Sequence, residues 1–345
     1  MSSSLSRLEV VQREMIRSMS SILLLSGVIG NILNCLIFSH RSLRHKSCSF
    51  YFFGTSLANL LTLCFGCLTR LLIIWGVTPY ISSLSFYCKI RSFFTMFGLS
   101  ASSWFIVAAC ADRYASSCSN ARIRSLSQVK VAHRVSIVMS VLIALVWSQM
   151  FICFQGDVIG VNCNPSTRFC HTINDVVLLL FYSILPPLLM FLFGFLTIRN
   201  VQNRSIHRTT NKKERQLTAM LVAQVLWVTI LSLPISIQKI YAEFVIDDKK
   251  SKERLEVETF LATLVVLIAF TNTSVSFYLF TLTSELFRKE LKSLFFCSYQ
   301  RQSTIQPILM KSRRNRPVTY QSYEQTTTTT TTTTAMMTTT TQLHS

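Results

Sequence analysis

Seven long apolar runs constrain this sequence more than any other feature. Each holds enough apolar or small residues for a helix that crosses the ~30 Å hydrocarbon core of a bilayer. The chain is 50% hydrophobic and 14% charged over 345 residues, too apolar for an ordinary soluble protein of this size. We therefore predict an all-α membrane protein, a seven-transmembrane-helix bundle within 22–283. The runs are 21–38, 51–75, 88–114, 134–154, 176–198, 216–241 and 257–281.

Lys and Arg residues concentrate on one side of these runs. The segments on that side, 40–48, 115–134, 199–215 and 282–345, carry 21 of them, and the segments on the other side carry eight. Cytoplasmic loops of membrane proteins are enriched in Lys and Arg, so this asymmetry predicts a multi-pass protein with its N-terminus outside and its C-terminus in the cytoplasm. The formal net charge of +19 thus follows the membrane side, which argues against nucleic acid as a partner.

Three segments flank the predicted bundle. Residues 1–21 are expected to form a short polar extracellular N-terminus without a cleavable signal peptide. Residues 284–297 place Leu and Phe on one helical face and basic residues on the other, which predicts a short amphipathic eighth helix on the inner leaflet. Cys297, near its end, is either palmitoylated or an unmodified thiol. The tail 298–345 is basic and then threonine-rich, so it is expected to be a disordered cytoplasmic segment.

The third run is bounded by residues of distinct chemistry. It starts at Cys88 and ends on Asp112-Arg113-Tyr114. Cys88 and Arg113 are separated by roughly 37 Å of helix, so each faces a different compartment. The cysteine lies where disulfides form, and the Asp-Arg pair lies where a charge still reaches water. At this spacing the run resembles the third transmembrane helix of rhodopsin-like (class A) G-protein-coupled receptors.

The resemblance to this family extends over residues 22–297. Asn59 stands where the family has an aspartate that helps to hold a sodium ion, so we expect weak or absent sodium modulation. Two further departures are Ser232, at the position of a tryptophan in the sixth span, and 276–280, where the family has Asn-Pro-x-x-Tyr. Family positions for interior polar groups and helix kinks are matched by Asn31, Asn59, Trp147, Pro187, Pro234 and Asn272.

The resemblance implies a switch at the cytoplasmic side. In the family, the residues at Asp112, Arg113 and Tyr114 serve coupling to the G protein. Glu214, at the base of the sixth span, occupies the position of an acid that pairs with the arginine, so Arg113 is expected to pair with Asp112 and Glu214 in the resting state. Glu214 is alternatively one solvated charge within a basic stretch.

The resemblance also implies a disulfide between the third span and the loop before the fifth. Cys88 is expected to pair with Cys170, with Cys163 as the alternative partner. Most of the eleven cysteines, Cys153 among them, lie inside apolar runs, where a thiol behaves as a small hydrophobic group.

Two family positions disfavour two classes of ligand. Thr95 replaces the aspartate of amine receptors, and Phe270 replaces the lysine that binds retinal in opsins. The overall pattern resembles invertebrate neuropeptide receptors, including the FMRFamide-like group, which implies a peptide ligand. Candidate ligand contacts near the outer helix ends, weighed against Lys and Arg side chains that merely reach the interface, are Arg70, Lys89, Arg91, Thr95, Lys239 and Glu243.

Other functions stay open beside a plasma-membrane receptor that couples an extracellular ligand to a heterotrimeric G protein. A chemosensory receptor for a small non-peptide ligand and a receptor-fold protein that has lost coupling are both compatible with the departures. A transporter is disfavoured because no repeat pairs the first three spans with a later set. No enzyme, metal site or cofactor is predicted, because the histidines show no metal-ligand spacing. Phosphorylation of the threonine tail would add arrestin as a partner.

Overall fold

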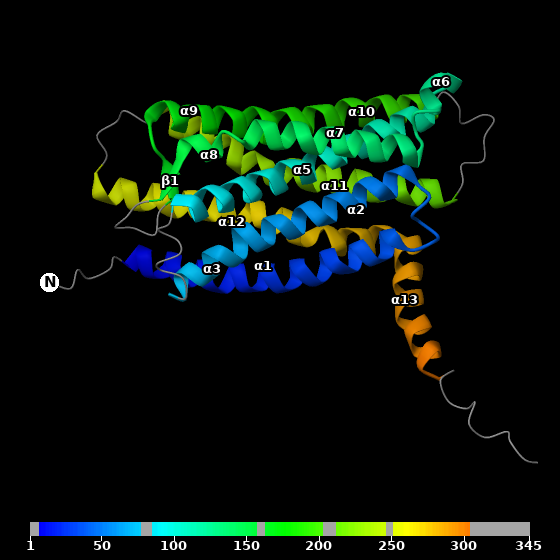
Figure 1. Ribbon diagram of the computed structural model, residues 1–345, viewed down its shortest axis with the longest axis horizontal. Coiled ribbons are helices and arrows are strands. Elements are labelled where there is room, and N and C mark those ends of the chain that lie inside the picture. The colour runs from blue at the N-terminus through cyan, green and yellow to red at the C-terminus, as the bar shows by residue number, and fades with distance from the viewer. Residues whose placement is uncertain (1–6, 77–84, 157–162, 203–211, 246–250, 304–345) are drawn as a thin grey trace, which may run out of the picture. The chain divides into compact units, whose positions relative to one another are not determined.

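The computed structural model describes residues 7–76, 85–156, 163–202, 212–245 and 251–303. Within these residues, seven helical segments are long and apolar enough to cross a membrane, which confirms the predicted all-α class (Figure 1). These segments are Arg7–Ser39, Ser47–Ile74, Phe86–Ser117, Val129–Cys153, Arg168–Asn200, Arg215–Ala242 and Lys252–Thr283.

The helices are longer than the apolar runs that predicted them. Helix α1 (Arg7–Ser39) begins inside the segment expected to be the polar N-terminus, and α12 (Lys252–Thr283) begins five residues before its apolar run. Neither extension contains a proline or glycine that would end the helix early. The helical geometry therefore continues past the point where the apolar pattern stops.

Two of the spans contain a turn of π-helix. The second span consists of α2 (Ser47–Thr62), η1 (Leu63–Leu68) and α3 (Thr69–Ile74). The fifth consists of α9 (Arg168–Val177), η2 (Leu178–Ile184) and α10 (Leu185–Gln202). A π-turn inserts one extra residue per turn and changes which side chains face the interior, and such turns are frequent at functional sites.

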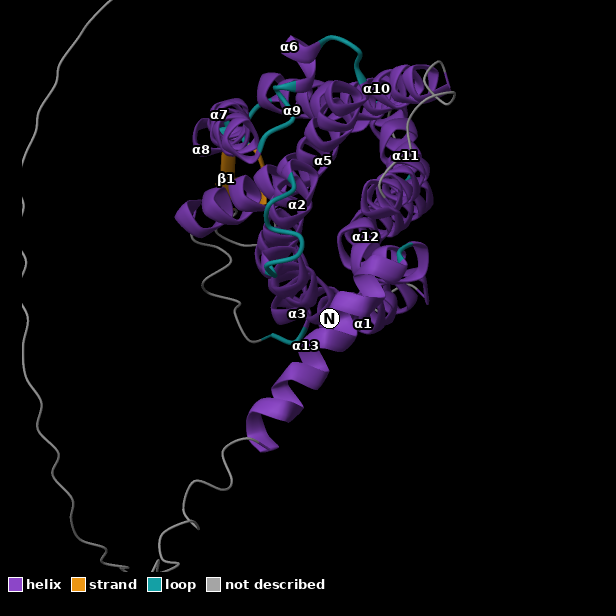
Figure 2. Cartoon of the chain, turned by 90° about the vertical axis from the view of Figure 1, so that its right-hand side faces the viewer, coloured by secondary structure: helices purple, strands orange, loops and turns teal. Residues whose placement is uncertain are grey.

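The remaining elements complete the bundle around α5 (Ser85–Ser117), the most buried span. Figure 2 views the bundle end-on, with α2 beside α5 and α1 beside α12. The other elements are α6 (Ala121–Arg124), α7 (Val129–Trp147), α8 (Met150–Cys153), β1 (Phe154–Gly156), β2 (Cys163–Pro165), α11 (Lys212–Phe244) and α13 (Glu285–Ser303).

Glycines allow two of these helix pairs to approach closely. A Cβ atom on Gly98 of α5 would lie 2.7 Å from the backbone oxygen of Ala58 in α2. A Cβ atom on Gly30 of α1 would lie 2.8 Å from Cβ of Phe277 in α12. Both distances are shorter than real contacts, so only glycine fits. The hydrophobic effect does not drive helices together in lipid, and small residues at helix contacts instead allow the backbones to pack closely.

An aromatic cluster anchors α13 to the bundle. Phe287 is 1% exposed, and its ring centroid lies 5.7 Å from that of Phe38 and 5.9 Å from that of Phe280. The apolar face predicted for 284–297 therefore packs on α1 and α12 at its first turn. The helix ends at Ser303, six residues beyond the predicted boundary. The side chain of Cys297 lies outside the described residues.

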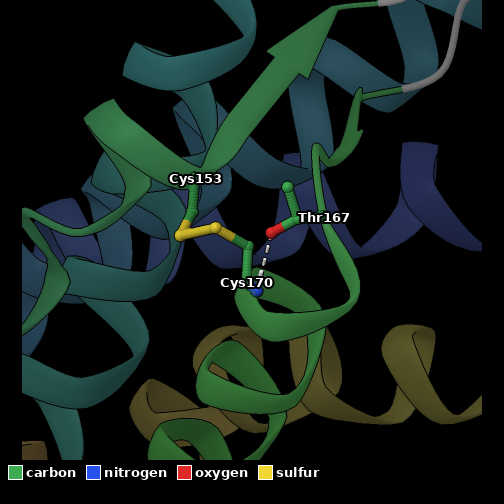
Figure 3. Close-up of a disulfide and its surroundings, with 3 residues drawn as sticks. All are labelled: Cys153, Thr167 and Cys170. Carbon is green, nitrogen blue, oxygen red and sulfur yellow. Dashed lines mark hydrogen bonds between the residues drawn. A yellow bond between two sulfur atoms is a disulfide. The ribbon is translucent and has the colours of Figure 1, made fainter.

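A short hairpin and a disulfide follow the fourth span. Strands β1 and β2 pair antiparallel, with Gly156 opposite Cys163, and return the chain to the end of α8. The Thr167 hydroxyl then accepts a 3.2 Å hydrogen bond from the backbone N–H of Cys170 and caps α9 (Figure 3). Cys153 and Cys170 consequently lie 5.3 Å apart between Cα atoms and form a disulfide.

This disulfide corrects two sequence-based expectations. The predicted Cys88–Cys170 pairing is wrong, because Cys170 bonds Cys153, and Cys153 is not a free hydrophobic thiol. Cys88 is also disulfide-bonded. Cys163, the alternative partner, stays the prediction for Cys88; its side chain lies outside the described residues, while strand β2, which begins at Cys163, contacts α5.

Candidate functional site

One end of the bundle carries a buried ion pair at the end of α5, and we call it the Arg113 end. Arg113 Nη2 donates a 2.9 Å hydrogen bond to Oδ2 of Asp112, and the two residues are 5% and 7% exposed. The Ser127 hydroxyl donates to Asp112 Oδ1 at 2.8 Å and shares a 3.3 Å hydrogen bond with the Ser47 hydroxyl at the start of α2. The network fixes the carboxylate and holds the guanidinium inside the bundle.

The other residues predicted for this end have different surroundings. The ring of Tyr114 faces α10, with its centroid 6.0 Å from that of Phe193. The side chain of Glu214 lies outside the described residues, so its predicted pairing with Arg113 stays a prediction. Arg113 and Asp112 are neighbours in the chain, which is why sequence reasoning could place them together.

A cluster of neutral polar groups occupies the interior between α1, α2 and α12. Asn31 Nδ2 donates to the backbone oxygen of Thr273 at 2.9 Å. Asn31 Oδ1 accepts from Asn59 Nδ2 at 3.2 Å and from the Ser276 hydroxyl at 3.3 Å. Asn34 Nδ2 donates to the same hydroxyl at 3.3 Å. The amides predicted to face the bundle therefore do so, and no acid takes part in these bonds.

The remaining interior residues named by the sequence lie in the bundle core. Trp147 is fully buried, and its indole N–H donates to the Ser100 hydroxyl at 2.9 Å, which joins α7 to α5. Asn272 of α12 is 6% exposed, so its amide lies inside the bundle. Pro234 lies inside α11, and Pro187 lies just after η2.

The opposite end, which we call the Cys88 end, holds the candidate ligand contacts in separate places. The Arg70 guanidinium lies 5.9 Å from the ring centroid of Phe270. The Thr95 hydroxyl donates to the backbone oxygen of Arg91 at 2.7 Å within α5. Lys89 and Arg91 are half-buried on α5, and the side chain of Glu243 lies outside the described residues.

Lys239, another of these candidates, is paired with Asp175, an acid that the sequence analysis did not include among the site residues. Its ammonium donates to Asp175 Oδ1 at 2.7 Å, and Asp175 is 4% exposed. This ion pair joins α11 to α9. The missed signal was the position of Asp175 beside the start of the fifth apolar run, where a carboxylate needs a partner.

The sequence of the chain matches the model of a known protein family. Residues 30–276 match the family model of the 7 transmembrane receptor (rhodopsin family), which covers more than half of the chain. The chain belongs to this receptor family. A search of curated proteins found no match for the chain. The family is one of membrane receptors rather than enzymes, and its members act through an extracellular ligand and a G protein.

The receptor contains two further contacts that its sequence did not reveal. At the Arg113 end, Gln216 Oε1 of α11 accepts a 2.8 Å hydrogen bond from the backbone N–H of Leu286. This N–H belongs to the first turn of α13, where backbone donors lack helical partners. In the core, the Trp104 indole N–H donates to the backbone oxygen of Phe181 at 3.0 Å. Each contact depends on two spans far apart in the sequence.

Proposed function

We propose that this receptor binds an extracellular peptide and activates a heterotrimeric G protein at the plasma membrane. The observation that carries the proposal is the buried Arg113–Asp112 pair at the end of α5. A buried ion pair carries a large desolvation cost that its Coulomb attraction often does not outweigh, so its presence at the end of α5 favours a functional role over a stabilising one. An arginine held in this way is ready to change partners when neighbouring helices move.

The proposed switch is a movement of α11 away from α5 at the Arg113 end. In the resting form, Arg113 stays with Asp112, and Glu214 is proposed as its second partner. Outward movement of α11 would separate Glu214 from Arg113 and open a cleft for the G protein. To reverse a resting equilibrium from 1:99 to 99:1, the ligand must bind the open form ~10⁴-fold more tightly than the closed form.

A peptide is the proposed ligand class because polar and charged groups are spread widely over the Cys88 end. Arg70 lies on α3, Arg91 on α5, and the Asp175–Lys239 pair between α9 and α11. An extended ligand with several polar groups can contact such dispersed positions, whereas a small amine would need one dominant carboxylate. Thr95 stands where that carboxylate would be.

The proposal also assigns orientation and partners. The Cys88 end would face the exterior and the Arg113 end the cytoplasm, as the distribution of Lys and Arg favours. Palmitoylation of Cys297 would fix α13 to the inner leaflet. Phosphorylation of the threonine-rich tail would create an anionic segment for arrestin.

The test is nucleotide exchange on a panel of G proteins with the purified receptor and a neuropeptide library. We expect a peptide to stimulate exchange, Arg113→Ala to abolish the stimulation, and Glu214→Ala to raise exchange without peptide. Cell-surface expression and thermal unfolding serve as folding controls. If the folded receptor stimulates no G protein with any peptide, the proposed ligand class or the coupling is wrong; a non-peptide library then separates the two cases.

A further inference from the structure

Two buried atoms of α9 face each other without a hydrogen-bond partner among the residues that the structure describes. They are Nδ1 of His171 and Oδ2 of Asp175, and they lie 3.7 Å apart. The two residues are four positions apart in α9, so both side chains lie on the same face of the helix. Neither belongs to the switch at the Arg113 end.

The separation is too long for a hydrogen bond, whose N···O distance is about 2.9 Å. A buried polar atom without a partner costs about 1–3 kcal/mol, so two such atoms side by side call for an explanation, and a bound ion is one of the usual ones. The ordinary alternative is a protonated imidazole held near the carboxylate by charge alone.

The carboxylate of Asp175 cannot turn freely to relieve this arrangement. Its other oxygen, Oδ1, accepts from Lys239 Nζ at 2.7 Å and from Asn174 Nδ2 at 3.2 Å. These bonds fix the carboxylate with Oδ2 toward His171. Partners of this kind orient the ligands of metal sites, because they hold a carboxylate in one position before the ion binds.

We propose that His171 and Asp175 form a binding site for a divalent transition-metal ion, with Zn²⁺ the best-suited. Zinc binds imidazole nitrogen and carboxylate oxygen at about 2.0–2.2 Å from each atom. Two such bonds span the 3.7 Å between Nδ1 and Oδ2 without a change of helix geometry. Imidazole together with a carboxylate suits zinc better than calcium or magnesium, which prefer oxygen ligands alone.

The surroundings define what kind of site this is. The His171 side chain is 40% exposed, which gives an ion access from the Cys88 end. No group of three or more His, Cys, Asp and Glu side chains suited to a metal occurs in the described part of the chain, so water or a bound ligand completes the coordination. The Lys239 ammonium lowers affinity for a cation. The site is therefore a weak, modulatory one that ties α9 to α11 through Asp175, and it does not depend on the proposed function.

The experiment is thermal unfolding of the full-length receptor in detergent, titrated with ZnCl₂ and, separately, with MgCl₂. We expect Zn²⁺ to raise the unfolding temperature saturably, Mg²⁺ to have no such effect, and a chelator to reverse the rise. His171→Ala should abolish the zinc-dependent rise. His133→Ala, at an exposed histidine of α7, is the matched control and should keep it.

Calorimetric titration with ZnCl₂ measures the same site without unfolding. The expected result is one Zn²⁺ per receptor, lost in His171→Ala and retained in His133→Ala. Because the His171 side chain is partly exposed and its Nδ1 has no hydrogen-bond partner in the described residues, its replacement should leave the receptor folded. Zinc binding that is unchanged in His171→Ala, or absent from the wild type, would overturn the proposal in favour of the protonated imidazole.

Discussion

The indole N–H of Trp104 in α5 donates a 3.0 Å hydrogen bond to the backbone carbonyl of Phe181 in η2. In a π-turn each N–H bonds the carbonyl five residues earlier, and Leu185 does so with Leu180. The next N–H would reach Phe181, but residue 186 is proline and has none. Trp104 supplies the missing donor, so a side chain of one span completes the backbone of another.

Trp104→Phe tests this bond. Phenylalanine keeps an aromatic ring against Phe181, whose centroid lies 4.9 Å from that of Trp104, but it removes the donor. We expect the free energy of unfolding to fall by about 1 kcal/mol, because a partly buried acceptor is left unsatisfied. Thermal unfolding in detergent measures the change. Trp227→Phe is the matched control, since the Trp227 indole N–H is buried without a hydrogen-bond partner in the described residues; an equal loss in both variants would refute the explanation.

The neutral polar cluster predicts a response to sodium in one variant. In the wild type, the neutral amide of Asn59 replaces the family's sodium-binding aspartate and donates to Asn31 Oδ1 at 3.2 Å. Sodium should therefore not stabilise the receptor. Asn59→Asp replaces the donor by a carboxylate facing that oxygen, which should destabilise the fold by about 3 kcal/mol without a cation. Unfolding in NaCl should then occur at a higher temperature than in choline chloride. Asn59→Ala controls for the lost hydrogen bond, and sodium stabilisation of the wild type would contradict the prediction.

The bond between Gln216 and the Leu286 N–H should restrain α11. Gln216→Ala removes about 1 kcal/mol from the closed form, equivalent to about a five-fold shift in the equilibrium of α11. Under the proposed function, nucleotide exchange without ligand should rise about five-fold. Arg215→Ala, at the exposed neighbouring residue, should have no such effect. A spin-label distance between α11 and α13 reports the same movement if no G protein responds; an unchanged distance would exclude the restraint.

The disulfide predicts which peptides remain joined after digestion. Mass spectrometry of the unreduced receptor should find Cys153 linked to Cys170, and a Cys88–Cys170 peptide would contradict the structure. The double variant Cys153→Ser with Cys170→Ser should lower the free energy of unfolding by about 3 kcal/mol, as expected for a loop of this length. Cys118→Ser, at a buried free thiol, is the comparison for simple loss of sulfur.

The sequence by itself determined the seven spans and the contact between Asp112 and Arg113. Hydropathy adds up along a continuous stretch, and a lipid environment obliges such a stretch to be helical, so the spans follow from local composition. Asp112 and Arg113 are adjacent, and their pairing needs no knowledge of other helices. The eighth helix was likewise visible because its apolar residues repeat at helical spacing.

Only the tertiary structure decided which distant residues meet. Lys239 lies 64 positions from Asp175, and Trp104 lies 77 positions from Phe181. Cys170 was assigned to the wrong partner because Cys153 lies in an apolar run and was interpreted as a small hydrophobic group, whereas the β1–β2 hairpin brings Cys170 back to it. Each of these contacts depends on the rotation and height of one helix against another. Those are set by close packing at positions such as Gly98 and by the π-turns, which no local pattern in the sequence specifies.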